Sequence, residues 1–193
     1  MPTTPDLSDF GRHGREVRLE VEARLRAAKA FAEFALDGKT DKVDAPLVDH
    51  AVRMADSFPG LPVNFESERV VAYLHDVLED SEAKLVDEGL ADTIRLHGLS
   101  FTLTRAEAFA LEAITRREGE TYAEFIVRLR DEGNTISLLV KRADLYDHLA
   151  DPDAIPYSLK KRYWAALQVL EETQADSLGE VMGYEGQPES FLD

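Results

Sequence analysis

The sequence contains no cysteine in 193 residues, which excludes disulfides, zinc–thiolate sites and cysteine nucleophiles. Basic residues are also scarce, because 22 lysines and arginines face 38 acidic residues and leave a net charge of −16. A general nucleic-acid binder needs a basic surface to neutralise phosphates, so we expect no nucleic-acid partner. A small phosphorylated ligand held by a few local cations is still compatible with this charge.

Long apolar runs are missing as well. No uninterrupted stretch approaches the length of about 18 residues that spans a bilayer, and Met1–Asp6 lacks the charged-then-apolar pattern of a signal peptide. We therefore expect a cytoplasmic protein with no membrane partner. The hydrophobic content of 44% is ordinary for a folded chain, and the length suits one domain with a sizeable core.

Apolar residues recur at helical spacing over almost the whole chain, which predicts an all-α, single-domain helical bundle. Thr104 and Thr121 each stand three residues before a glutamate and predict capping boxes at the start of two helices. Only 136–140 has a strand-like composition, and it is too short and isolated to make a sheet. The expected helices cover about 15–36, 44–58, 70–80, 81–88, 91–97, 104–115, a segment from 121, 136–149 and 158–181.

One domain, residues 13–183, is expected between two loose ends. Residues 1–12 contain proline, threonine and glycine, and residues 184–193 contain Gly186 and Pro188. Such segments at a terminus are typically poorly ordered. No internal repeat or linker divides the interval between them.

The segment 74–80, Leu-His-Asp-Val-Leu-Glu-Asp, gathers one histidine and three carboxylates directly after an apolar run. Side chains three or four residues apart on a helix are neighbours, so a continuous helix brings His75 beside Glu79 and Asp76 beside Asp80. Buried carboxylates are costly unless they are paired or bind a metal, and acids are unfavourable near a helix C-terminus. Because no basic residue lies inside the segment, the pattern predicts a divalent cation.

Two other segments offer further ligands. His50 lies in an apolar helical stretch, where a single histidine is more often a packed residue. Asp144 also lies in an apolar helix, with His148 one turn later, and alone it would more often pair with Lys141 or Arg142. Two imidazoles and two carboxylates together suit an octahedral ion such as Mn²⁺ or Fe²⁺, with Zn²⁺ also suited. The predicted ligands are His50, His75, Asp76 and Asp144.

The order of these ligands along the chain resembles the HD superfamily of metal-dependent phosphohydrolases, which implies an HD-type helical bundle. The surrounding residues look like the hydrolase domain of RelA/SpoT-type proteins. They are Asp41-Lys42 followed by Pro46 and His50, then 74–81, then 139–144. Segment 114–122 is similar to compact bacterial relatives that lack a synthetase domain. The resemblance covers roughly residues 30–165.

The resemblance implies a manganese-dependent enzyme that removes pyrophosphate from the 3′ position of the guanosine alarmone (p)ppGpp. In that family the residues that match the four predicted ligands hold the metal, which lowers the pKa of bound water and polarises a phosphoryl oxygen. The residues that match Glu79 and Asp80 transfer protons and orient water, a contribution of about 10²–10⁴ in rate. Alternatively, Glu79 and Asp80 end a helix in solvent and have no catalytic role.

His148 is the most serious departure from the family, which has asparagine there in contact with the nucleotide. Three interpretations of His148 are open: a hydrogen bond to substrate, a ligand of a second metal with Asp144, or a helix-end histidine that interacts with the dipole. Hydrolysis of a different phosphorylated nucleotide is therefore the alternative activity. A non-catalytic regulatory protein that binds metal or nucleotide is an alternative of a different class.

Phosphate groups need cations in a protein this acidic. Lys42 is the strongest candidate, because it precedes His50 and matches a family residue near the substrate phosphates. Arg117 and Lys141 are further candidates, for which a surface role is at least as plausible. The sequence gives no indication of the oligomeric state.

Overall fold

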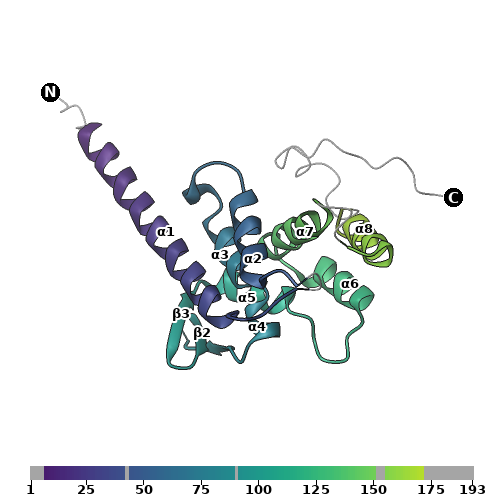
Figure 1. Cartoon of the computed structure of the whole chain (residues 1–193). Helices are drawn as coiled ribbons and strands as arrows, with labels where there is room; N and C mark the ends of the chain where they lie inside the picture. The colour runs from purple at the N-terminus through teal and green to yellow at the C-terminus, as the bar shows by residue number, and fades with distance from the viewer. Residues whose placement is uncertain (1–6, 42–43, 90, 151–154, 172–193) are drawn as a thin grey trace.

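The computed structural model describes residues 7–41, 44–89, 91–150 and 155–171. In chain order the elements are α1 (Leu7–Ala35), α2 (Leu47–Ser57), the 3₁₀ helix η1 (Pro62–Asn64), α3 (Glu66–Leu74), α4 (Val77–Asp80), β1 (Lys84–Asp87), β2 (Asp92–Leu96), β3 (Leu99–Leu103), α5 (Arg105–Ile114), α6 (Tyr122–Glu132), α7 (Thr135–Ala150) and α8 (Tyr157–Glu171). Figure 1 shows their arrangement. The predicted tail 184–193 and the end of the last predicted helix lie outside the described residues, so the domain boundaries stay predictions.

The prediction of an all-α fold is wrong, because the chain also forms a three-stranded antiparallel sheet in the order β1-β2-β3. Residue Leu85 pairs with Ile94, and Ile94 pairs with Phe101. Strands β1 and β2 lie where two short helices were expected. The fold is therefore mixed, with a small sheet that lies at one side of the helices and packs against α1 and α5 (Figure 1).

The sequence of the β2–β3 hairpin explains why helices do not form there. In β2 the side chains of Ile94 and Leu96 are buried and that of Arg95 is exposed, which is the alternation of a half-buried strand. His97 and Gly98 both have positive φ, 48° and 87°, as the two central residues of a tight hairpin turn require. The alternation at 94–96 and this turn together outweigh the helical pattern expected for the same segment.

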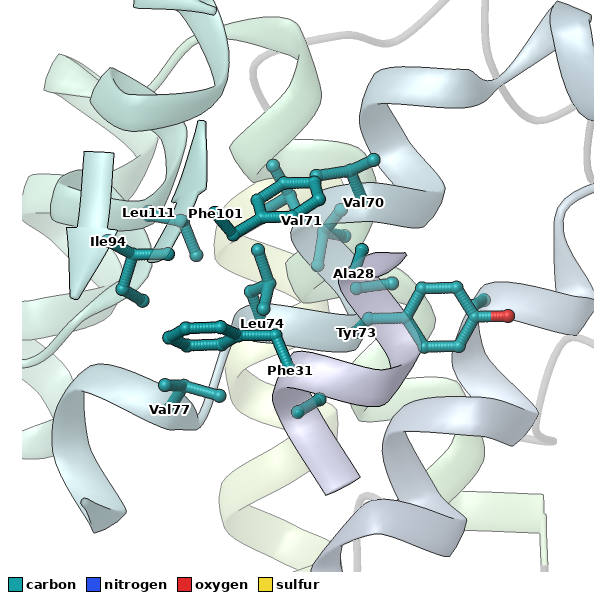
Figure 2. Close-up of a cluster of buried hydrophobic side chains, with 14 of the residues drawn as sticks. Ala28, Phe31, Val70, Val71, Tyr73, Leu74, Val77, Ile94, Phe101 and Leu111 are labelled. Carbon is teal, nitrogen blue, oxygen red and sulfur yellow. The ribbon is translucent and has the colours of Figure 1, made fainter. Parts of the chain in front are cut away.

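Helix α3 lies at the centre of the main core and packs against α1, α2, α5 and α7. Its apolar run 70–74 is buried throughout. Figure 2 shows Leu74 among side chains from other elements, including Phe31 of α1, Phe101 of β3 and Leu111 of α5. Burial of such side chains is worth about 1.5–3 kcal/mol each, so the core fixes the position of the chain that directly follows α3.

Helix α7 lies between two apolar clusters. Val140 and Ala143 belong to the main core, whereas Leu138 and Leu145 join a second cluster with side chains from α6 and α8. A polar stripe separates these two faces, with residues three and four apart: Lys141, Asp144 and His148. The core packing of α7 therefore holds this stripe toward α2 and the end of α3.

The helix caps predicted at Thr104, Thr121 and Asn134 are confirmed, and each depends on residues close in sequence. Thr104 and Thr121 each form a complete capping box with the glutamate three residues later. Asn134 Oδ1 accepts a hydrogen bond from the Ser137 N–H at 2.9 Å, so it caps α7, and the strand-like segment 136–140 is helical. Asp44 does not cap α2: it has φ of 60° and Pro46 precedes the helix.

Helix α1 begins at Leu7, well before the predicted start near residue 15. Residues 13–20 are exposed along this helix, and Figure 1 shows its first half extending away from the other elements. Within the described ranges no helix combines the length and apolarity that crossing a membrane demands.

Candidate metal centre

His75 and Asp76 lie at a break between α3 and α4. The prediction of one continuous helix through this segment is therefore wrong. The backbone of Asp76 has φ −90° and ψ −9°, a conformation common where helices are interrupted. The Asp80 N–H donates to the Asp76 carbonyl at 2.8 Å, so Asp76 is the N-cap at which α4 begins. The break follows the fully buried Leu74, so the core places both side chains.

The hydrogen bonds of His75 leave one ring nitrogen for a cation. Its Nδ1–H donates to the carbonyl of Ala72 at 2.8 Å, and because a carbonyl only accepts, the proton must be on Nδ1. Nε2 lies 3.2 Å from Asp76 Oδ2, a pairing that a shared proton or a shared cation stabilises. His75 is 5% exposed, so this nitrogen is held in a fixed direction.

His50 projects from α2 and is buried between two carboxylates of α7. Its Nδ1 lies 2.7 Å from Asp147 Oδ2 and its Nε2 lies 3.0 Å from Asp144 Oδ1. Burial alone lowers the pKa of His50, but the hydrogen bonds with Asp144 and Asp147 outweigh burial and raise the pKa to about 10. The surroundings of His50 therefore favour positive charge strongly.

Asp144 has a different partner on each of its oxygens. Oδ2 lies 2.6 Å from Lys141 Nζ, whereas Oδ1 faces the Nε2 atoms of His50 and His148 at 3.0 and 3.2 Å. Burial alone raises the pKa of Asp144, but the charge of Lys141 and the two imidazoles hold it well below its ordinary value. The carboxylate is thus ionised, with one oxygen directed at imidazole nitrogens.

The four predicted metal ligands come from three separate segments and divide between two groups that share His50. Two groups of donor atoms, each within 4.8 Å of one another, overlap at His50: one adds His75 and Asp76, the other Asp144 and His148. The ring centroids of His50 and His75 are 5.3 Å apart. Such a mixed imidazole and carboxylate set fits Mn²⁺, Fe²⁺ or Zn²⁺.

A pocket of about 410 Å³ opens beside these ligands. Asp76 and both predicted proton-transfer residues, Glu79 and Asp80, line it. The Glu79 carboxylate accepts a hydrogen bond from the Arg116 N–H at 2.6 Å, which ties it to the start of the α5–α6 loop. Burial, followed by repulsion from Asp76, raises the pKa of Asp80, which favours its protonated form. The full lining is Thr40, Asp41, Leu47, His75, Asp76, Glu79, Asp80, Ile114, Arg116, Tyr122, Phe125, Lys141, Asp144, His148, Arg162 and Tyr163.

The predicted substrate-binding residues have different positions. His148 and Lys141 both line the pocket, but Lys141 is bound to Asp144 as well. Arg117 lies outside the pocket lining and pairs with Glu132 at 3.1 Å. Lys42 lies outside the described residues.

Four residues near the centre were not predicted from the sequence: Asp147, Arg53, Tyr122 and Arg162. Asp147 orients His50 and is itself held by Arg53, whose Nε and Nη2 atoms lie 3.0 and 2.8 Å from its two oxygens. The hydrogen bonds from His50 and Arg53 overcome burial and lower the pKa of Asp147 to about 2. The spacing of Asp147 from Asp144, three residues on a helix, was an available signal.

Tyr122 and Arg162 form another part of the pocket wall that the sequence did not reveal. The guanidinium of Arg162 lies over the Tyr122 ring, 5.7 Å from its centroid. Arg162 lines the pocket, and within the described ranges it has no ion pair with an acidic side chain. The two residues come from α6 and α8, so only the tertiary fold places them together.

No family model matches the chain, and no curated protein matches it.

Proposed function

We propose that this chain is a metal-dependent phosphohydrolase that acts in the cytoplasm on a small phosphorylated nucleotide, with removal of the 3′-pyrophosphate of (p)ppGpp as the leading reaction. The observation that carries the proposal is the meeting of His50, the His75–Asp76 pair and Asp144 beside one pocket. His50 and Asp144 are 94 residues apart in sequence. Their order along the chain is the one that resembles the HD phosphohydrolases.

Mn²⁺ is the first candidate because of the resemblance to the HD phosphohydrolases, and the donor set also fits Fe²⁺ and Zn²⁺. A bound divalent ion supplies a nucleophilic hydroxide near neutral pH and polarises a phosphoryl oxygen. Lys141 keeps Asp144 ionised, and Asp147 holds His50 with Nε2 toward Asp144. Such outer contacts fix the orientation of ligands and typically affect metal affinity about 10–100-fold.

Glu79 and Asp80 have complementary roles in this proposal. Burial and repulsion from Asp76 raise the pKa of Asp80, which favours its role as the group that takes up and releases a proton. Glu79 is fixed by the Arg116 N–H and orients water as an acceptor. The pocket lining also includes Arg162, whose guanidinium lies over the Tyr122 ring and is suited to an anionic group of a nucleotide.

His148 supports the second candidate, hydrolysis of a nucleotide other than (p)ppGpp. Its ring stacks against His50, with centroids 4.5 Å apart and planes at 24°, and Nε2 lies 3.2 Å from Asp144. A histidine held toward the ligands is poorly placed to act as the nucleotide-contacting asparagine of the resembled family. The substrate base therefore has to be tested directly.

The deciding experiment measures phosphate and pyrophosphate release by Mn²⁺-loaded protein over a nucleotide panel that includes (p)ppGpp. The Glu79→Gln/Asp80→Asn variant is expected to keep metal binding and to lose about 10²–10⁴ in turnover. A Glu16→Gln/Asp56→Asn variant, which makes the same changes at exposed positions away from the pocket, is the matched control. Full activity of the first variant contradicts the assigned roles. Absence of turnover by the wild type on every nucleotide favours the regulatory alternative.

A further inference from the structure

His148 is held rigidly beside the metal centre. It lies in α7 one turn after Asp144, with its ring between those of His50 and Tyr163. The ring centroids are 4.5 Å from His50 and 5.1 Å from Tyr163, and the planes differ by only 24° and 21°. Stacking on both neighbours limits tilting of the His148 ring. The contact of Nε2 with Asp144 Oδ1 at 3.2 Å limits rotation within the ring plane, so the two together set the direction of Nε2.

Nε2 of His148 faces the same oxygen of Asp144 as Nε2 of His50, which is a predicted ligand. The Nε2 atoms of His50 and His148 lie 3.0 and 3.2 Å from Asp144 Oδ1. The three donor atoms are mutually within 4.8 Å, a spacing that one ion with bonds of about 2.0–2.2 Å can span. Lys141 occupies the other oxygen of Asp144, so Oδ1 is the oxygen free to bind an ion.

We propose that His148 is a third imidazole ligand of the same ion that His50, His75, Asp76 and Asp144 bind. The inference rests on the metal centre of the proposed function and goes beyond it by naming a fifth protein ligand. One coordination position of an octahedral ion is then left for water or substrate. A third imidazole also favours Fe²⁺ and Zn²⁺ relative to Mn²⁺, because imidazole suits the former and carboxylate the latter.

A competing role for His148 is the donation of a hydrogen bond to Asp144 with no bond to the metal. Glutamine separates the two roles, since its amide still donates a hydrogen bond but brings no imidazole nitrogen. His13→Gln makes the same change at an exposed position in α1 and serves as the matched control. Far-ultraviolet circular dichroism and thermal melting identify a variant that fails to fold.

The test counts imidazole nitrogens bound to Mn²⁺ in the full chain by electron spin echo spectroscopy, with ¹⁵N-labelled histidine as the reference. We expect three in the wild type and in His13→Gln and two in His148→Gln. We also expect His148→Gln to weaken Zn²⁺ affinity about 10–100-fold and Mn²⁺ affinity less. The wild-type count decides the matter even where the variant does not fold.

Two coordinated imidazoles in the wild type overturn the proposal for His148. An unchanged nitrogen count in a folded His148→Gln variant also overturns it, even where affinity falls, because the histidine then acts through a hydrogen bond alone. In both cases Mn²⁺ is still bound, so the proposed hydrolase function survives. Failure of the wild type to bind any of these ions removes the hydrolase proposal itself.

Discussion

Two buried carboxylates, Glu107 and Asp144, have opposite roles although both face a cation. Glu107 is 0% exposed and takes hydrogen bonds from Arg24 at 2.9 and 2.5 Å and from the Thr104 N–H at 2.8 Å. Asp144 is 4% exposed and has Lys141 on one oxygen and two imidazoles on the other. The first links α1 to the start of α5, and the second lies beside the pocket.

The chemistry of the partners distinguishes the two sites. Guanidinium and backbone N–H groups only donate, so the Arg24 and Thr104 contacts of Glu107 come from atoms that cannot bind a metal. The third contact comes from the Ser67 hydroxyl, and no imidazole faces this carboxylate among the described residues. An imidazole nitrogen is a donor when protonated and a metal ligand when not. Burial alone would raise the pKa of either acid, yet Arg24 lowers that of Glu107 and Lys141 lowers that of Asp144. A buried, ionised carboxylate therefore marks a candidate metal site only when its neighbours carry lone pairs.

Asp144→Asn is expected to have the largest effect, because it removes a ligand and leaves Lys141 buried without its charge partner. We expect Mn²⁺ affinity to fall at least about 100-fold, more than the loss of an outer contact usually costs. The free energy of unfolding should also fall by about 3–5 kcal/mol, as for other broken buried pairs. Calorimetric titration and urea denaturation measure the two quantities.

Glu107→Gln makes the same chemical change in the other site and is expected to affect stability alone. Arg24 keeps Glu66 as a second partner at 2.9 Å but loses its buried one, so we expect a loss of about 3–5 kcal/mol in the free energy of unfolding. Mn²⁺ affinity should match that of the wild type under conditions where the variant is folded. Weakened Mn²⁺ binding in folded Glu107→Gln, or wild-type binding in Asp144→Asn, would contradict the distinction.

The sequence predicted the parts of the site whose residues lie close together along the chain or form a recognisable set. The His75–Asp76 pair stood out because acids followed a buried apolar run without basic partners. Asp144 and His50 were recognised only as a set, since each alone suits a packed or paired residue. In the structure Asp144 forms an ion pair with Lys141 and also lies beside the His50 imidazole.

The sequence failed where a contact depends on packing between distant elements. Arg162 and Tyr122 meet only because α6 and α8 pack together. The spacing of Asp147 from Asp144 indicated that both lie on one face of a helix. Its ion pair with Arg53 of α2 could not be predicted, because it depends on the packing of α2 against α7. The sheet was not predicted for a different reason: its strands are only four or five residues long, and β1 and β2 lack a regular alternation. The positive φ of His97 and Gly98 is visible only in the structure.

Glu120 offers a milder third case, because it faces an arginine as Glu107 does but at the edge of the fold. Its oxygens lie 2.7 and 2.9 Å from Arg128, which also donates to the carbonyls of Ala113 and Thr115. The hydrogen bonds from Arg128, against a smaller effect of burial, lower the pKa of Glu120 from 4.5 to about 2. The stabilising contact thus joins α6 to the end of α5 and the loop that follows it.

Glu120→Gln is expected to give the smallest effect of the three and a defined pH dependence. A carboxylate with a lowered folded-state pKa stabilises the protein fully above its ordinary pKa and loses this contribution as the pH falls toward the folded-state value. The wild type should therefore exceed the variant by about 2 kcal/mol at pH 7, with a difference that shrinks between pH 4.5 and about 2. Urea denaturation at several pH values measures it, with Glu118→Gln in the same loop as the exposed control. If the difference in the free energy of unfolding did not change with pH, the charge of Glu120 would not be what holds Arg128.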